Sequence, residues 1–229
     1  MDTIHCKSGE SYIIDESGVI TQVDPKPYVY DQQYLDYYEG LKERTIRLGF
    51  MRAGYINGYL QSHLKRPVKS ILEFGYGSGS FLDAAKKSGI ESCNGTDIQH
   101  FPLPDGCSFL NRKEVFDGTF DVVAMFDVLE HIETLQFLEL LKTKYLFLTV
   151  PLCKYNSILG SEKANEWFEY WRMRRPNEHI HHFDEESLVF KMAEYGYRVA
   201  PDSLTYMENP IRLREGESGH NVFTMIFER

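Results

Sequence analysis

Three glycines at alternate positions, preceded by an acidic residue, make up the segment of this chain best suited to binding a small ligand. The segment runs from Glu73 through Gly75, Gly77 and Gly79, and it follows a short apolar run that begins at Ile71. Such a run is typical of a buried strand, and the residues after the glycines have helical spacing. A strand, a glycine turn and a helix N-terminus together present free N–H groups and a positive dipole end. The sequence therefore predicts a site for a small anionic group here.

The helix after this turn has its own start and stop signals. Ser80 and Asp83 have the spacing of a capping box, with Asp where Glu or Gln is usual, and Gly89 supplies the stop. The glycine spacing differs from G-x-G-x-x-G, in which the backbone approaches a pyrophosphate. This difference disfavours a nucleotide-binding oxidoreductase.

A second acidic residue, Asp97, ends the next expected strand, 22 positions after Gly75. A carboxylate at this place can accept hydrogen bonds from both hydroxyls of a ribose. An exposed aspartate at the end of a strand has the same appearance in sequence. The glycine turn upstream favours the ligand-binding interpretation.

The glycine turn and Asp97 together resemble motif I and the ribose-binding residue of the class I S-adenosylmethionine (SAM)-dependent methyltransferases. The resemblance spans about residues 45–227. It implies that the turn passes under the amino-acid end of SAM, and that SAM is contacted by residues of both strand ends. These residues are Glu73, Gly75, Gly77, Gly79, Asp97 and Ile98.

Two further segments resemble the ubiquinone-biosynthesis O-methyltransferases within that class. Arg52-Ala-Gly-Tyr-Ile56 is similar to their stretch before motif I, in which the Arg contacts SAM, and a guanidinium suits the SAM carboxylate. Arg47 offers a rival match in another register. Asp127-Val-Leu-Glu-His131 is similar to their segment after the fourth strand, which implies that Phe126 lies against SAM. Phe126 also fits the role of a core aromatic residue.

Asp127, Glu130 and His131 share one face if their segment is helical, because they stand at positions i, i+3 and i+4. The resemblance associates a Glu-x-x-Glu-His at this place with a divalent cation, and Asp replaces the first Glu here. Two carboxylates and an imidazole suit Mg²⁺ or a similar ion. In the alternative, Glu130 and His131 brace the following helix. His131 is also our first candidate for a general base.

Three histidines lie within four residues at His179, His181 and His182. Such a cluster can ligate a transition metal. The methyltransferases that this chain resembles carry a similar segment as a lid on the substrate side, which implies that His179 and His182 line the acceptor pocket and act in catalysis. Four aromatic residues offer a wall over the substrate, although such residues are more often core: Tyr28, Tyr30, Trp167 and Trp171.

The elements that must hold these residues alternate between strand and helix. Strands are expected at 71–74, before Asp97, and at 107–110, 120–126, 145–150, 197–200 and 220–227. Helices are expected up to about Leu64, after Gly79, and at 132–141, 162–174 and 185–195. The proline-rich stretch 98–106 is expected to be a loop, and Asn111 follows at the place of an adenine-binding acidic residue.

This order matches an α/β fold, the Rossmann-like seven-stranded methyltransferase sheet with helices on both faces and a final antiparallel strand. Residues 11–23 add a small hairpin. We expect residues 1–66 to form an N-terminal hairpin and helical cap. Residues 67–229 then form the SAM-binding core, with a lid insertion at about 152–184.

The composition limits which classes of partner the chain can have. A net charge of −9 over 229 residues disfavours nonspecific attraction to nucleic acid or anionic membranes. The sequence contains no apolar run of membrane-spanning length and no signal-peptide pattern at its start. Four cysteines without a C-x-x-C pair predict reduced thiols in a cytoplasmic protein. Oligomeric state stays open, a homodimer included.

The resemblance predicts an enzyme that transfers a methyl group from SAM to an oxygen or nitrogen of a small-molecule acceptor, with a divalent cation such as Mg²⁺ as a second cofactor. Two alternatives share the same core motifs: a methyltransferase of protein or tRNA, and a SAM-binding protein without catalytic activity. The acidic charge balance weakens the tRNA alternative.

Overall fold

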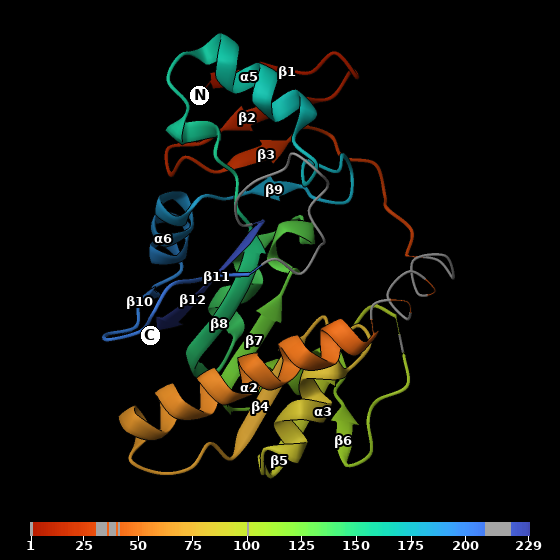
Figure 1. Cartoon of the computed structure of the whole chain (residues 1–229), viewed down its shortest axis with the longest axis vertical. Helices are drawn as coiled ribbons and strands as arrows, with labels where there is room; N and C mark the ends of the chain where they lie inside the picture. Colours follow the sequence, from red (N-terminus) through yellow and green to blue (C-terminus); the bar gives the residue numbers. More distant parts are fainter. Residues whose placement is uncertain (1, 31–35, 37–39, 41, 100, 209–220) are drawn as a thin grey trace.

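A twisted central sheet organises the molecule in the computed structural model, which describes residues 2–30, 36, 40, 42–99, 101–208 and 221–229 (Figure 1). Its strand order is β10-β12-β8-β7-β4-β5-β6, and β11 also pairs with β12. The strands β4 to β8 are parallel, and β12 is antiparallel to β8. The bounds are β4 Ser70–Phe74, β5 Ser92–Thr96, β6 Cys107–Phe109, β7 Phe120–Phe126, β8 Thr143–Pro151, β10 Arg198–Val199, β11 Tyr206–Glu208 and β12 Val222–Glu228.

Strands β10 and β11 occupy one position in this sheet. Val199 pairs with Phe227 and Glu208 pairs with Val222, so both strands follow the edge of β12 that faces away from β8. The sheet therefore has seven strand positions, and the predicted fold class is confirmed. The sequence analysis expected a strand at 197–200 but missed β11.

Apolar side chains cover both faces of the central strands, because neighbours in a strand point to opposite sides. Ile71 and Val122 pack under α2 (Lys42–Leu64) and α3 (Ser80–Lys87), and Figure 1 shows both helices on that face. Leu72 and Val123 pack on the other face, against α4 (Arg112–Asp117) and α6 (Glu185–Glu194). Helices thus cover both faces, as expected.

A second, four-stranded antiparallel sheet lies at the top of Figure 1, under α5 (Ser161–Tyr170). Its strands are β1 Asp2–His5, β2 Ser11–Ile14, β3 Ile20–Gln22 and β9 His181–His182. The predicted hairpin corresponds to β2 and β3, whereas β1 was not expected. Because β3 pairs with β9, this sheet joins the N-terminal segment to the 152–184 segment across the boundary that we placed at residue 66.

Several helix boundaries differ from the prediction. Gly79, with φ of 71°, is the N-cap of α3, so Ser80 is the first helical residue and forms no capping box. The stretch 132–141 contains only a 3-10 helix, η2 (Leu135–Leu140), and α5 ends at Tyr170 instead of residue 174. The short helix α4 was not expected. No helix within the described ranges is long and apolar enough to cross a membrane.

Candidate functional site

A cavity of about 1250 Å³ opens at the carboxyl ends of β4, β5 and β7. Ligands collect at this end of the strands in open parallel sheets, because the loops there diverge from a strand crossover. Its described lining includes the glycine turn, Asp97, the N-terminal half of α2 and residues 173–179. The cavity therefore contains both the predicted SAM-binding segments and part of the predicted lid.

The glycine turn needs glycine for two separate reasons. Gly75, Gly77 and Gly79 all have positive φ, at 75°, 47° and 71°. A Cβ on Gly75 would lie 2.4 Å from a methyl carbon of Val128, and one on Gly79 would lie 2.7 Å from Pro104. A Cβ on Gly77 would meet no atom within 4 Å, so only its backbone conformation favours glycine.

Asp97 is tied to this turn through the main chain. One carboxylate oxygen accepts a hydrogen bond from Gly77 N at 2.9 Å, and the other accepts one from Gln99 N at 2.9 Å. Each carboxylate oxygen can accept a second bond. The structure thus brings Asp97 and the turn together, and the next residue, Ile98, is exposed on the cavity rim. The 98–106 stretch is without a helix in its described part, as predicted.

Glu73 lies below the turn and is 5% exposed. Burial raises the pKa of its carboxyl group well above the usual range, and the nearby Arg52 guanidinium opposes that shift. One of its oxygens has no hydrogen-bond partner among the described residues. Glu73 therefore offers an acceptor to the floor of the cavity.

Arg52 reaches the same floor from α2. Its Nε and Nη2 donate to the two carboxylate oxygens of Glu208, at 3.1 and 2.6 Å. Its guanidinium lies 4.1 Å from the Phe126 ring centre, and Nη2 is 3.8 Å from Asp127 Oδ2. Phe126 lines the cavity and also packs on core residues, so its core role is confirmed and its contact with SAM stays a prediction. The rival Arg47 is exposed and pairs with Glu43.

Glu130, His131 and His179 line the same cavity and converge there, with one ligand atom from each within 4.8 Å of the others. Glu130 and His131 lie in a one-turn 3-10 helix, η1 (Leu129–His131), that begins directly after β7. Asp127 precedes it with φ of 56°, so the helical face expected for Asp127, Glu130 and His131 does not form. Asp127 lies near Arg52, with 3.8 Å between Oδ2 and Nη2. The third member of the cluster is therefore His179 instead of Asp127. The predicted metal set is corrected accordingly.

Hydrogen bonds fix the tautomers of both histidines. His131 Nδ1 lies 2.7 Å from the carbonyl oxygen of Glu178, and His179 Nδ1 lies 2.7 Å from that of Met173. A carbonyl oxygen only accepts, so each Nδ1 carries the proton. Each Nε2 therefore keeps a lone pair for a metal ion or a substrate proton.

Burial sets the charges of the cluster. It lowers the pKa of His131 to about 4 and that of His179 well below its usual value, so both rings are neutral at pH 7. It raises the pKa of Glu130 well above the usual range and that of Asp127 to about 6. Both carboxylate oxygens of Glu130 are buried and have no hydrogen-bond partner among the described residues, and Oε1 lies 3.8 Å from His131 Nε2.

The other two histidines of the 179–182 cluster, His181 and His182, do not line the cavity. His182 packs in β9 against the rings of Tyr12, Phe168 and Trp171, at 5.2–5.6 Å between ring centres. His181 bonds Thr21 and a main-chain carbonyl. The expectation that His182 lines the acceptor pocket with His179 is therefore wrong, because the pairing of β9 with β3 puts His182 in the second sheet, where its ring is buried against Phe168 of α5 and Tyr12.

Several lining residues were missed. Tyr30 Oη lies 2.9 Å from His131 Nδ1, and Arg175 Nη1 donates to Glu178 at 2.9 Å beside the histidines. Tyr30 was noted only as an aromatic wall candidate, and the Arg175–Glu178 spacing of three was available as a signal. Asn111 lines the cavity, but its side chain caps α4 by accepting from Lys113 N and Glu114 N.

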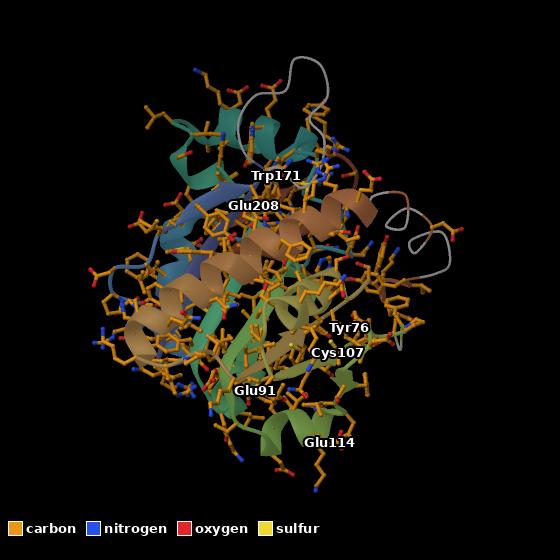
Figure 2. All side chains as sticks on the ribbon, turned by 60° about the horizontal axis from the view of Figure 1, so that its bottom comes forward. Tyr76, Glu91, Cys107, Glu114, Trp171 and Glu208 are labelled. Atoms are coloured by element: carbon orange, nitrogen blue, oxygen red, sulfur yellow. The ribbon has the colours of Figure 1, made fainter. Side chains whose placement is uncertain are left out.

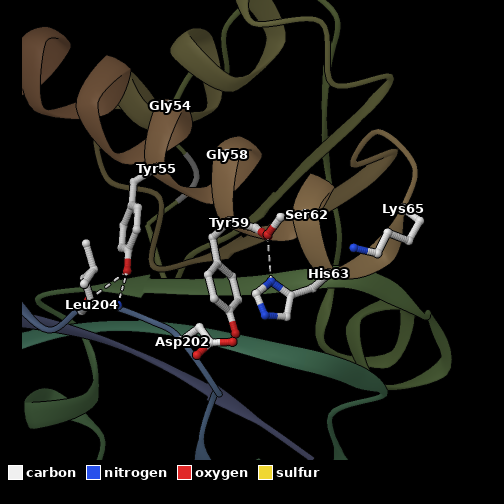
Figure 3. A pocket seen from close by; sticks show the side chains of 9 residues that line it. All are labelled: Gly54, Tyr55, Gly58, Tyr59, Ser62, His63, Lys65, Asp202 and Leu204. Atoms are coloured by element: carbon white, nitrogen blue, oxygen red, sulfur yellow. Dashed lines mark hydrogen bonds between the residues drawn. The ribbon is translucent and has the colours of Figure 1, made fainter.

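A second, shallower pocket of about 740 Å³ lies along the C-terminal half of α2 (Figure 3). Tyr55 and Tyr59 bond the main chain of Leu204 and Pro201, and Ser62 bonds His63. None of the residues predicted to bind SAM or to act in catalysis lines it. The larger cavity is therefore the candidate active site.

Comparison with known proteins identifies the family to which this chain belongs. The family model described as "Methyltransferase domain" matches residues 50–201, which is more than half of the chain. Among the curated proteins, none matches this chain in sequence.

Solved structures show the same fold. Magnesium protoporphyrin IX methyltransferase from Synechocystis PCC 6803 with bound S-adenosylhomocysteine (SAH) is 16% identical, with a TM-score of 0.56 over 87% of this chain and 96% of that one. The plantazolicin methyltransferase BpumL with SAH is 14% identical, with a TM-score of 0.51 over 86% and 88%. The methyltransferase domain of a bacterial Hen1 is 17% identical, with a TM-score of 0.50 over 79% and 98%. None of these three is a ubiquinone-biosynthesis enzyme, so that finer resemblance stays a prediction.

Proposed function

Since this chain belongs to the methyltransferase-domain family and is a SAM-dependent methyltransferase of class I, we propose that it methylates an oxygen or nitrogen of a small-molecule acceptor. The observation that carries this proposal is the shared cavity. The glycine turn and Asp97 form one wall, and Glu130, His131 and His179 form another wall. One ligand can thus be held at each side with the reacting atoms between them.

SAM is proposed to lie along the first wall. Gly75, Gly77 and Gly79 face its amino-acid end, and the second lone pairs of Asp97 accept from the ribose hydroxyls. Ile98 is placed to cover the adenine ring, and Phe126 to contact the rest of the cofactor. The exposed position of Ile98 and the main-chain bonds that orient Asp97 support this assignment.

A divalent cation is proposed at Glu130, His131 and His179. The residues fit such an ion, since both Glu130 oxygens are buried without a hydrogen-bond partner among the described residues and each imidazole presents an unprotonated Nε2. The Nδ1–carbonyl bonds are the usual way of orienting ligating histidines. Two imidazoles and a carboxylate suit Mn²⁺, Fe²⁺ or Zn²⁺ better than Mg²⁺, which prefers oxygen. When bound, the ion would supply a Lewis acid that orients the acceptor oxygen.

Metal binding is tested directly. Protein treated with EDTA is titrated with Mn²⁺, Zn²⁺ or Mg²⁺ by calorimetry, for wild type, His179→Ala and the control His63→Ala on the outer face of α2. We expect one site in wild type and in the control, and its loss in His179→Ala. If wild type binds no ion, the cation proposal is wrong and His131 Nε2 becomes the group that takes the acceptor proton.

The acceptor is proposed to be small and neutral or cationic. In the described lining, six side chains carry carboxylates and three carry guanidinium groups. A lining without an excess of positive charge disfavours a polyanion such as tRNA. Met173, Arg175, Glu178 and His179 all line the cavity from the 152–184 segment, which supports a lid role for that segment.

SAH release tests the reaction and its acceptor. Wild type, Asp97→Ala and the control Asp117→Ala, an exposed aspartate in α4, are incubated with SAM and panels of phenols, amines, tRNA and unmodified protein. We expect turnover with a phenol or amine for wild type and control, and none for Asp97→Ala. Turnover confined to tRNA or protein would contradict the acceptor class, and full activity of Asp97→Ala would contradict the SAM site.

A further inference from the structure

Arg52 uses one edge of its guanidinium for a protein partner. Nε and Nη2 donate side by side to Glu208, at 3.1 and 2.6 Å, and both residues are buried. Figure 2 shows Glu208 beside α2, from which Arg52 extends. A two-bond contact of this kind fixes the plane of the guanidinium as well as its position.

Glu208 also accepts a hydrogen bond from a second side chain. Its Oε1 also accepts from Thr224 Oγ1 at 3.3 Å, and Thr224 Oγ1 lies 2.7 Å from Thr149 Oγ1. Both threonines are fully buried in the sheet. Glu208 does not line the cavity, whereas Arg52, Phe126 and Asp127 do. Its side chain therefore contacts the cavity lining through Arg52.

The other edge of the guanidinium, formed by Nη1 and Nη2, remains for the cavity. Nη1 has no hydrogen-bond partner among the described residues, and Nη2 is 3.8 Å from Asp127 Oδ2. An arginine can bind two carboxylates at once, one along each edge. The carboxylate of the SAM methionine suits the second edge.

We propose that Glu208 is a positioning residue for the methionine end of SAM, because it holds Arg52 with its Nη1–Nη2 edge toward the cavity. Without Glu208, the buried guanidinium turns to Asp127, the nearest other carboxylate, and its free edge is lost to the cofactor. This inference rests on the SAM site proposed above and is independent of the acceptor.

Two nucleosides distinguish positioning from a general structural role. SAH carries the amino-acid group, whereas 5′-methylthioadenosine lacks it. Both are titrated by calorimetry into wild type, Glu208→Gln and the control Glu228→Gln. Glu228 is also buried in the sheet and accepts from Nε and Nη2 of Arg198, but outside the cavity.

Glu208→Gln should weaken SAH binding about 10- to 100-fold, as expected for a lost charge-assisted hydrogen bond. The affinity for methylthioadenosine should change less than about twofold in Glu208→Gln. Glu228→Gln should leave the affinities for both nucleosides unchanged. Equal weakening of both nucleosides, or unchanged SAH binding, would overturn the proposal. If wild type binds neither nucleoside, the SAM site itself fails.

Thr224→Val provides a second variant if Glu208→Gln does not fold. It removes one bond to Glu208 and keeps its charge. We expect a smaller loss, about two- to fivefold, again confined to SAH. A loss shared by methylthioadenosine would contradict the positioning role.

Discussion

The half of the cavity around the glycine turn is built mainly from main-chain groups of neighbouring segments, whereas the half around Glu130 is built from side chains of distant segments. Gly77 N meets Asp97 across two adjacent parallel strands. His179 meets Glu130 and His131 only because residues 173–179 fold back over η1. The first half is rigid strand-end geometry, and the second depends on how the lid segment packs.

The difference extends to electrostatics. The glycine half offers hydrogen-bond groups with defined partners, such as the carboxylate of Asp97. The Glu130 half holds a buried carboxyl group without a hydrogen-bond partner among the described residues, and two neutral imidazoles. An arrangement of this kind destabilises the fold unless something binds it, which is typical of a functional site. The two halves should therefore respond differently to mutation.

The largest effect is expected from Glu130→Gln. We predict that kcat falls about 1000-fold, while SAH affinity stays within about twofold, because Glu130 belongs to the acceptor half alone. Stability should rise by about 1 kcal/mol, since a buried carboxylate without a partner is removed. Steady-state kinetics, calorimetry and urea unfolding of this variant and of the exposed control Glu139→Gln check the three parts. A matching loss of SAH affinity would mean that the two halves are not separate.

Gly75→Ala should disrupt the half of the cavity around the glycine turn. Its Cβ would lie 2.4 Å from Val128 and its φ is 75°, so the turn must move. We expect SAH affinity to fall about 100-fold in calorimetry. The control is Gly54→Ala in α2, where a Cβ meets nothing within 4 Å, and there the protein should gain about 0.5–1 kcal/mol. Unchanged SAH affinity in Gly75→Ala would remove the turn from the site.

These two halves also differ in how far the sequence predicts them. The glycine turn, α3 and Asp97 were foreseen because each depends on contacts between nearby residues. His182 was misplaced because its burial depends on β9 pairing with β3, some 160 residues away. Arg52 was assigned to SAM without Glu208, its partner 156 positions along the chain. For Asn111 the signal was present, since Asn111 and Glu114 have capping-box spacing, but an adenine role was considered instead.

His182 should affect stability and leave catalysis unchanged. Burial lowers the pKa of His182 from its ordinary value of 6.5 to about 3 in the folded protein. Below pH 6.5 the unfolded chain therefore binds a proton at this histidine, whereas the folded chain does not. The stability due to neutral His182 is therefore complete above pH 6.5 and declines as the pH falls toward 3. At pH 4.5 the loss is about 2–3 kcal/mol.

His182→Phe removes this proton uptake and keeps the ring packing. Urea unfolding between pH 7 and 4.5 should show a smaller loss of stability by about that amount, with kcat unchanged at pH 7. His5→Phe, at an exposed position of β1, serves as the control. An inactive but stable His182→Phe would return this histidine to the acceptor site.

The smallest effect is expected from Asn111→Ala, which sharpens the boundary of the SAM half. Loss of the α4 cap should cost about 1 kcal/mol of stability, measured by urea unfolding. SAH affinity should change less than about twofold, because the side-chain oxygen is engaged by α4. A tenfold loss of affinity would show that Asn111 binds the adenine ring.

A crystal structure with SAH and Mn²⁺, recorded with anomalous scattering from manganese, tests the central arrangement most directly. The account predicts the ribose at Asp97, and one anomalous peak at Glu130, His131 and His179 with the sulfur of SAH directed toward it. A nucleoside bound away from the glycine turn, or bound there with its sulfur directed away from that cluster, would contradict it.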